Sequence, residues 1–197
     1  LRIFSTPSRV YPGQVLTHGG IDVITPLAGR SQLSLARAAE SGMCDAGTVE
    51  GLVREADVVL SVLVPAEAER IADEVIAAME ALGKRPPFVD CNAIAPQTVA
   101  RIAERIEAAG AVFIDAGIIG QPPKPGEQRT RLHCSGPDTS AFEALAENGL
   151  DVRRVGPTVG QASGLKMVYA SSTKGTYALW TELFVAAHAL DLSEALM

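Results

Sequence analysis

The sequence predicts an α/β protein in which a doubly wound, mostly parallel sheet is followed by a long helix. Short β-branched runs alternate with amphipathic helical stretches between Ile21 and Val155, a pattern typical of right-handed β-α-β units. Residues 57–64 are almost wholly apolar, as expected of a strand covered on both faces. A final helical pattern, residues 161–188, is too long for a crossover helix and no strand follows it. We therefore expect two units, residues 1–156 and residues 160–197.

The composition limits the class of protein. With 197 residues, 47% of them hydrophobic, the chain can bury a sizeable core, and its net charge of −6 argues against a nucleic-acid partner. No apolar run approaches the ~20 residues of a membrane span, and the N-terminus lacks the layout of a signal peptide. We therefore expect no membrane partner and a cytoplasmic protein. Cys44, Cys91 and Cys134 are widely spaced, which favours buried thiols in a reducing compartment over a metal site or disulfides.

The individual elements follow from β-branched runs, capping residues and breakers. Ser31 and Thr48 are suitable N-caps, and Pro96 suits the first turn of a helix. The expected strands are residues 1–4, 21–25, 57–64, 87–91, 111–115, 131–135 and 151–155. The expected helices are residues 32–40, 49–56, 66–82, 96–110, 140–148 and 161–188.

Residues 5–20 are the hardest part of the sequence to interpret, and we assign no element to them. A dinucleotide-binding fold would carry Gly-x-Gly-x-x-Gly after its first strand. Residues 5–14 read Ser-Thr-Pro-Ser-Arg-Val-Tyr-Pro-Gly-Gln instead, with Gly13 as the one glycine. The glycine fingerprint is therefore missing.

One lysine stands near the start of the long helical pattern, in the segment Gly160-x-x-x-Gly164-x-Lys166. Apolar neighbours would strip solvent from Lys166, which lowers the pKa of its amine and favours a base near neutral pH. The alternative is a lysine that lies along the helix and reaches water. The segment resembles the catalytic segment of the β-hydroxyacid dehydrogenases, the group that includes 6-phosphogluconate and 3-hydroxyisobutyrate dehydrogenases. That resemblance implies that Lys166 is the general acid/base.

The loop after the second expected strand reads Pro-Leu-Ala-Gly-Arg-Ser and ends at Arg30 and Ser31. In doubly wound nucleotide-binding folds this loop meets the adenosine ribose, where an acid binds the 2′-hydroxyl and an arginine accommodates a 2′-phosphate. The loop has no acid, which favours NADP, with NAD as the alternative. Without this context the two residues would be a surface arginine and an N-cap serine.

Two further segments resemble cofactor-contacting turns of the same family. Residues 60–65 resemble its strand ending in Leu-Pro and place Val64 and Pro65 beside the cofactor. Residues 90–96, Asp-Cys-Asn-Ala-Ile-Ala-Pro, resemble its Asp-x-Ser-Thr-x-x-Pro turn, with Asn92 in the serine position. The resemblance implies that Asn92 contacts the nicotinamide ribose, whereas an isolated asparagine in a turn would bond its own backbone.

The expected substrate contacts come from a loop and from the long helix. Residues 113–121 resemble the family's Asp-Ala-Pro-Val-Ser-Gly-Gly loop, which implies substrate contacts from Gly120 and Gln121; Ile119 replaces the serine and leaves the substrate open. On the helix, Tyr169 and Thr173 share the face of Lys166. Lys174 follows them and is expected either to anchor a substrate carboxylate or to reach solvent. The histidine and glutamate of the decarboxylating 6-phosphogluconate enzymes are absent from positions 169 and 173, which argues against decarboxylation of a sugar phosphate.

Together these resemblances imply a Rossmann-like dinucleotide-binding domain, residues 1–156, and the start of an all-α domain, residues 160–197. Residues 160–175 look like those of a subgroup of NAD(P)-dependent oxidoreductases in this superfamily. The implied activity is hydride transfer between NADP and a β-hydroxyacid-type substrate at a CH–OH group. The sequence ends in what reads as the first turn of a new helix, so we expect a fragment whose complete all-α domain would form a homodimer.

Two alternatives to that activity stay open. Imine reductases share the implied fold but usually carry aspartate or tyrosine in place of the lysine, so Lys166 argues against them. The second alternative is a non-catalytic nucleotide-binding or oligomerisation remnant, since the glycine fingerprint is missing and the helical domain is short.

Overall fold

The computed structural model describes residues 2–4, 12–120 and 130–196. Its centre is an eight-stranded sheet in the order β3-β2-β1-β4-β5-β6-β7-β8. The strands are β1 (Arg2–Phe4), β2 (Asp22–Thr25), β3 (Cys44–Asp45), β4 (Val58–Ser61), β5 (Phe88–Asp90), β6 (Phe113–Ile119), β7 (Arg131–Ser135) and β8 (Val152–Gly156). All neighbouring strands run parallel except β6 and β7, which pair antiparallel. The sequence-based expectation of an α/β protein with a mostly parallel sheet is confirmed.

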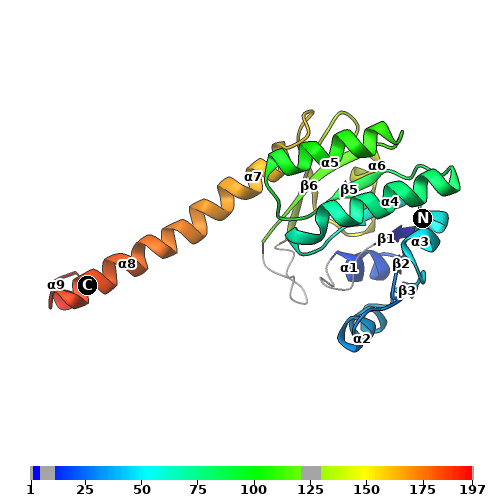
Figure 1. Cartoon of the computed structure of the whole chain (residues 1–197). Helices are drawn as coiled ribbons and strands as arrows, with labels where there is room; N and C mark the ends of the chain where they lie inside the picture. Colours follow the sequence, from blue (N-terminus) through cyan, green and yellow to red (C-terminus); the bar gives the residue numbers. More distant parts are fainter. Residues whose placement is uncertain (1, 5–11, 121–129, 197) are drawn as a thin grey trace.

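Helices cover both faces of the sheet (Figure 1). They are α1 (Gly13–His18), α2 (Gln32–Glu40), α3 (Val49–Glu55), α4 (Ala68–Leu82), α5 (Pro96–Ala108), α6 (Ser140–Glu143), α7 (Gln161–Ala170), α8 (Thr176–Ala189) and α9 (Ser193–Leu196). Short 3-10 turns, η1 (Pro65–Glu67) and η2 (Ala144–Asn148), precede α4 and follow α6. A π-helical turn, η3 (Ser171–Gly175), lies between α7 and α8.

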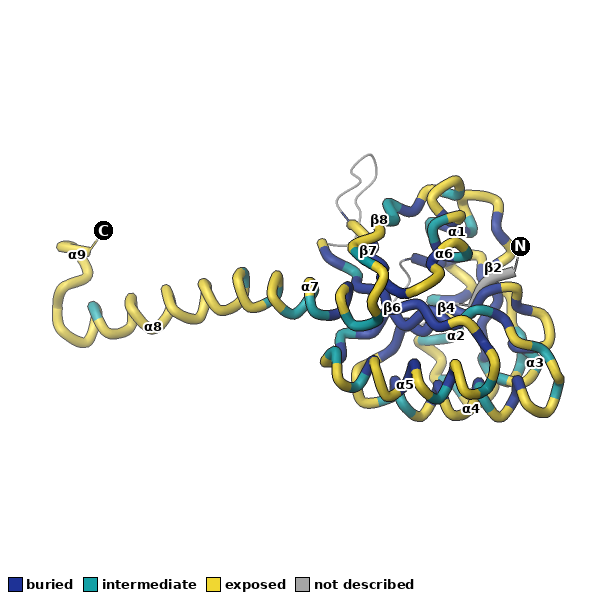
Figure 2. The backbone as a smooth tube through the Cα atoms, turned by 90° about the horizontal axis from the view of Figure 1, so that it is seen from above, coloured by how far each residue is buried: buried dark blue, intermediate teal, exposed yellow. Residues whose placement is uncertain are grey.

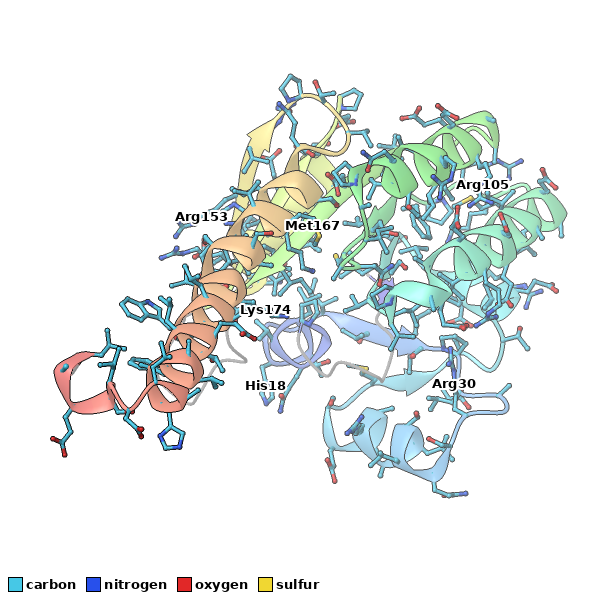
Figure 3. All side chains as sticks on the ribbon, turned by 60° about the vertical axis from the view of Figure 1, so that its left-hand side comes forward. His18, Arg30, Arg105, Arg153, Met167 and Lys174 are labelled. Atoms are coloured by element: carbon cyan, nitrogen blue, oxygen red, sulfur yellow. The ribbon has the colours of Figure 1, made fainter. Side chains whose placement is uncertain are left out.

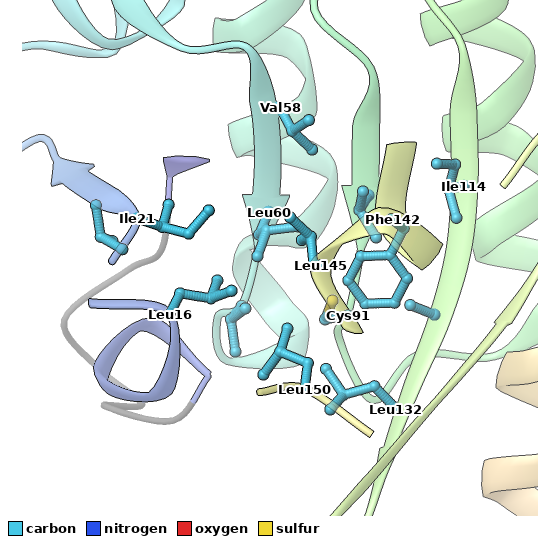
Figure 4. Close-up of a cluster of buried hydrophobic side chains, with 14 of the residues drawn as sticks. Leu16, Ile21, Val58, Leu60, Cys91, Ile114, Leu132, Phe142, Leu145 and Leu150 are labelled. Atoms are coloured by element: carbon cyan, nitrogen blue, oxygen red, sulfur yellow. The ribbon is translucent and has the colours of Figure 1, made fainter. Parts of the chain in front are cut away.

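The hydrophobic core lies in two layers, one on each face of the sheet. On one face, α1, α2 and the α6–η2 segment pack on the strands through residues such as Leu16, Phe142 and Leu145, which have no exposed surface (Figure 4). On the other face, α3, α4 and α5 bury Leu52, Val75, Ile102 and their neighbours. Helices α4 and α5 each bury a stripe of apolar side chains at helical spacing, as their amphipathic sequence patterns predict.

The structure adds elements to those expected from the sequence. Residues 13–18 form α1, and β3 is a two-residue strand. Strand β6 extends four residues beyond the expected end at Asp115 and pairs antiparallel with β7. The expected helix of residues 161–188 is continuous but contains the π turn η3.

The long helix leaves the body of the protein after its first turns. Helix α7 packs on β6, whereas α8 projects away from the sheet (Figures 1 and 2). All the large apolar side chains of α8 are between 45% and 75% exposed; they are Tyr177, Leu179, Trp180, Leu183, Phe184 and Val185. β8 ends at Gly156 and α7 begins at Gln161, and the division into two domains at this point stays a prediction.

Candidate cofactor and catalytic site

The order of the strands locates the candidate site. The chain winds outward from β1 to β2 and β3, then crosses back to β4, so the order reverses between β1 and β4. In open parallel sheets, ligands bind beyond the carboxyl ends of the strands at such a reversal. The expected cofactor residues follow the carboxyl ends of β2, β4 and β5, and α7 starts beside the same edge of the sheet.

Asp115 anchors the start of α7. Its side chain is fully buried on β6, and Oδ2 accepts hydrogen bonds from the backbone N–H groups of Gly160 (2.9 Å) and Ser163 (3.0 Å). The Ser135 hydroxyl on β7 donates to Asp115 Oδ2 at 3.0 Å and accepts from the backbone N–H of Ala162 at 2.9 Å. A carboxylate at a helix N-terminus satisfies free N–H groups and opposes the helix dipole. Asp115 therefore fixes where α7 begins, a role the sequence did not reveal.

Glycines let α7 approach the sheet and α5 closely. A Cβ atom at Gly117 on β6 would lie 2.9 Å from the carbonyl oxygen of Ala162 and 3.3 Å from the Cβ of Lys166. Gly160 has φ +94°, a conformation that favours glycine, and a Cβ there would lie 3.4 Å from the Cβ of Pro96. These contacts place the backbone of Lys166 against β6 at the carboxyl edge.

Asn92 belongs to a buried polar network between β4 and β5. Its Oδ1 accepts from the backbone N–H of Leu63 at 2.5 Å, and its Nδ2 donates to Ser61 Oγ at 2.8 Å and to Asp90 Oδ2 at 3.2 Å. Only 2% of Asn92 is exposed. The side chain thus holds the backbone that leads from β4 towards Val64, and a direct contact with a nicotinamide ribose stays a prediction.

The charge of Lys166 acts on the same network. Burial raises the pKa of Asp90 to about 6; hydrogen bonds from the backbone and side chain of Asn92 lower it, Asp115 raises it, and the charge of Lys166 lowers it. Burial also raises the pKa of the Cys91 thiol well above its usual range, and Lys166 again acts in the opposite direction. Lys166 is therefore electrostatically coupled to the carboxyl end of β5.

The remaining expected contacts fall into two groups. Val64, Pro65 and Gly120 are exposed at the carboxyl edge, and Gln121 lies outside the described residues. Tyr169 is 48% exposed on α7, whereas the Thr173 hydroxyl bonds the carbonyl oxygens of Tyr169 and Ala170 within its own helix.

Lys174 is exposed on the π turn, and Figure 3 shows it on the long helix. In an uninterrupted α-helix, residues eight apart lie almost a quarter turn off the same line. A π turn holds more residues than an α turn, so it rotates Lys174 back towards the line of Lys166. The two lysines are about 12 Å apart along the helix axis.

Figure 3 shows Arg30 near the end of β2. Its side chain lines a hollow of about 380 Å³. The loop around it is fixed by Asp45, whose Oδ1 accepts from the backbone N–H groups of Leu27 (3.1 Å) and Gly47 (2.7 Å). The Ser31 hydroxyl caps α2 by accepting from the N–H of Ser34 at 3.3 Å, so Ser31 has a structural role as well. The lining residues are Pro26, Ala28, Gly29, Arg30, Gly47, Thr48, Val49, Arg70 and Glu74.

The hollow suits the adenosine end of a dinucleotide. It has room for a ribose, and within the described part of the chain the Arg30 guanidinium makes no hydrogen bond or ion pair, so it is available to an anion. Arg70 and Glu74, from α4, were missed by sequence reasoning because they belong to the surface of a helix far along the chain. Nothing in their local sequence signals that the fold brings them to the β2 loop.

Two further observations concern other kinds of site. In residues 2–4, 12–120 and 130–196, no three side chains of His, Cys, Asp or Glu are grouped so that they could hold a metal ion. Over the same residues, every helix is too short or too polar to cross a bilayer.

Comparisons with known proteins show what this chain is similar to. A curated relative from Methanothermus fervidus, an uncharacterised 28.5 kDa protein, is 28% identical over 177 residues, which cover 90% of this chain and 66% of the relative. A conserved protein of unknown function, whose structure is described as similar to 3-hydroxyacid dehydrogenases, is 32% identical with a TM-score of 0.80 and covers 100% of this chain and 73% of its own.

More distant structures share the fold. The 3-hydroxyisobutyrate dehydrogenase of Mycobacterium tuberculosis is 21% identical with a TM-score of 0.75, over 98% of this chain and 66% of that one. An imine reductase from Myxococcus stipitatus in complex with NADP+ is 20% identical with a TM-score of 0.74, over 97% of this chain and 66% of that one.

The family model for the NAD-binding domain of 6-phosphogluconate dehydrogenase matches residues 16–148, two thirds of the sequence. The chain therefore belongs to the family of the NAD-binding domain of 6-phosphogluconate dehydrogenase.

Proposed function

We propose that this chain is part of an NADP-dependent oxidoreductase that acts on the CH–OH group of a β-hydroxyacid-type substrate. The observation that carries the proposal is the placement of Lys166, which Asp115, Gly117 and Gly160 hold at the carboxyl edge of β6. When bound there, the nicotinamide cofactor supplies the hydride acceptor or donor. The chain spans 66% of the length of its curated relative, so the activity of the whole protein belongs to this proposal.

Lys166 is the general acid/base in this proposal. In the oxidation direction its amine takes the proton from the substrate hydroxyl, and in reduction its ammonium returns that proton to the carbonyl oxygen. Tyr169 lies one turn further along the same helix and is half exposed, which supports a hydrogen bond from its phenol to the substrate. Lys174, which the π turn rotates towards the line of Lys166, suits a substrate carboxylate.

Cofactor binding is assigned to the carboxyl edge and the Arg30 hollow. Val64 and Pro65 offer exposed apolar surface after β4, and Arg30 offers a guanidinium to a 2′-phosphate. NAD is the alternative cofactor. We also assign homodimer formation to the exposed apolar side chains of α8, and sedimentation velocity over a range of protein concentrations tests that assignment.

Imine reduction is the second candidate, since imine reductases are among the proteins that share the fold. Imine substrates bring no hydroxyl proton for Lys166 to remove, and a lysine in this place favours the hydroxyacid reaction. A non-catalytic remnant is the third candidate, and it predicts cofactor binding without turnover of either substrate class.

The proposal is tested with Lys166→Met, which removes the amine and keeps most of the side chain length. We expect NADPH to bind more tightly than NADH, measured by the change in cofactor fluorescence, and the variant to keep that affinity. Turnover of 3-hydroxyacids should fall by about 10²–10⁴-fold, because an acid/base is lost. Lys174→Met is the matched control and should mainly raise the apparent KM.

The opposing outcomes separate the candidates. Near-normal turnover in Lys166→Met would show that another group moves the proton. Turnover of cyclic imines in preference to hydroxyacids would favour the second candidate. Binding of NADPH with no turnover of either class would favour the third.

A further inference from the structure

The Arg30 hollow contains an acid that the sequence of the β2 loop does not reveal. Glu74, from α4, lines the hollow together with Arg30, although the loop between β2 and α2 has no acidic residue. An acid beside the adenosine ribose accepts hydrogen bonds from a 2′-hydroxyl and repels a 2′-phosphate. Taken alone, Glu74 would favour NAD and oppose the assignment based on Arg30.

The positive charge of Arg70 offsets part of the negative charge of Glu74. Its guanidinium forms ion pairs with two carboxylates of the same helical segment, Glu67 at 2.5 Å and Glu74 at shorter range. These partners stand three residues before and four residues after Arg70, the spacings at which side chains on a helix meet. The pKa of Arg70 is raised, first by the hydrogen bond to Glu67 and also by the charge of Glu74.

The pairing leaves Arg30 as the cation of the hollow that no described carboxylate neutralises. Arg70 is shared between two acids, and its side chain remains 51% exposed at the edge of the same hollow. A doubly charged phosphate entering the hollow would therefore meet the positive field of Arg30 and a Glu74 carboxylate whose charge Arg70 partly offsets.

We propose that Arg70 determines cofactor specificity by acting on Glu74: it offsets the charge of the one acid among the described lining residues and so lets Arg30 select the 2′-phosphate of NADP. This inference rests on the proposed NADP-dependent function. Arg70 is a positioning residue in this account, because it acts through the Glu74 carboxylate.

The test measures dissociation constants for NADPH and NADH by fluorescence titration and by calorimetry, so it does not depend on turnover. Four variants are compared with the wild type: Arg30→Ala, Arg70→Ala, Glu74→Gln and the double variant Arg70→Ala with Glu74→Gln. Arg70→Ala should weaken NADPH binding by roughly fivefold, the effect of one exposed charge pair, and should leave NADH binding unchanged or tighter. The double variant should recover the NADPH affinity of the wild type, because the unpaired acid has been removed.

Two outcomes would overturn the inference. If the double variant binds NADPH as weakly as Arg70→Ala does, Arg70 contacts the phosphate itself. If Arg70→Ala weakens the binding of NADPH and NADH equally, the Arg70 side chain supports the adenosine site and does not distinguish the 2′-phosphate from the 2′-hydroxyl. In both cases Arg30→Ala can still lower the preference for NADPH, and the proposed function then stands. If Arg30→Ala leaves the preference unchanged, the NADP assignment fails and this inference fails with it.

The chain offers a matched control for the loss of a surface arginine. Arg54 and Glu50 form an ion pair of 2.6 Å at the same i,i+4 spacing, with side chains 58% and 54% exposed, and neither residue lines the hollow. Arg54→Ala should leave both dissociation constants at their wild-type values. A shift in that variant as large as in Arg70→Ala would show a general effect of net charge and would overturn the inference.

Discussion

Two aspartates stand side by side at the carboxyl edge of the sheet, and their surroundings differ. Asp90 on β5 and Asp115 on β6 are register partners, and both are buried. From residues that the structure describes, Asp115 accepts four hydrogen bonds: from Ser135, from the backbone of Gly160, and from the backbone and hydroxyl of Ser163. Asp90 accepts hydrogen bonds from the backbone and from the side chain of Asn92. Desolvation therefore dominates at Asp90 and raises its pKa to about 6.

This raised pKa predicts an unusual dependence of stability on pH. Asp90 has an ordinary value of 3.8 when the chain is unfolded, so between about pH 4 and pH 6 the folded state binds a proton that the unfolded state does not. Its contribution to stability is fully present below about pH 4 and is lost as the pH rises through 6. Between pH 7 and pH 5 we expect a gain of about 1 kcal/mol from this residue.

Urea denaturation of wild type and Asp90→Asn at both pH values measures the gain. The difference between the two proteins isolates Asp90, since groups such as Asp138 and Asp151, whose pKa values are lowered by hydrogen bonds from Ser140 and Arg153, are present in both. Asp90→Asn should lack the gain. An equal change in both proteins would assign the pH dependence to other residues.

At the scale of elements, the contact between β6 and α7 decides where Lys166 lies. Gly117→Ala would force its new methyl group within 2.9 Å of a backbone oxygen of α7, which cannot move independently of the helix. We expect a loss of about 1–3 kcal/mol of stability. A displaced α7 should also slow turnover about tenfold while cofactor affinity is kept, because misplacement of a catalytic group lowers the rate.

Gly175→Ala is the matched control on the same helical rod. A Cβ atom at Gly175 meets nothing within 4 Å, and its φ of −64° suits any residue. This substitution should be neutral or stabilise the helix by up to about 1 kcal/mol. Thermal denaturation and steady-state kinetics of both variants provide the comparison, and equal effects of the two substitutions would refute the account of Gly117.

The regular elements could be predicted from the sequence because each carries its own local signal. Helix α2 begins where the capping residue Ser31 indicates, and strand β7 has the expected bounds, residues 131–135. By contrast, the two exposed residues of β3 carry no alternation, and α1 has only six residues that follow a proline and begin with a glycine. β3 forms because it pairs with β2, and α1 forms because the core buries its Leu16; in both cases tertiary contacts outweigh weak local preferences.

At the scale of the whole molecule, the same limit applies to the candidate site. Arg30 and Lys166 could be proposed from their segments, since a loop position and a glycine spacing are local features. The pairing of Arg70 with Glu74 beside Arg30, and the anchoring of α7 by Asp115, join segments from different parts of the chain. To predict such contacts one must know the order of the strands in the sheet, and the hydrophobic periodicity of the sequence does not reveal that order. Confirmation of the family likewise came from comparison and not from any single residue.

The anchoring of α7 has a consequence for hydrogen exchange along the long helix. The first amides of a helix ordinarily exchange quickly, because they lack intrahelical partners. Here the amides of Gly160, Ala162 and Ser163 donate to buried oxygens of Asp115 and Ser135, so deuterium should enter them as slowly as it enters β6. The amides of α8, a 14-residue helix with exposed apolar side chains, should exchange far faster. The continuous helix would thus exchange slowly at its N-terminal end, in α7, and quickly at its C-terminal end, in α8. Self-association through α8 would slow the exchange of the α8 amides as the protein concentration rises.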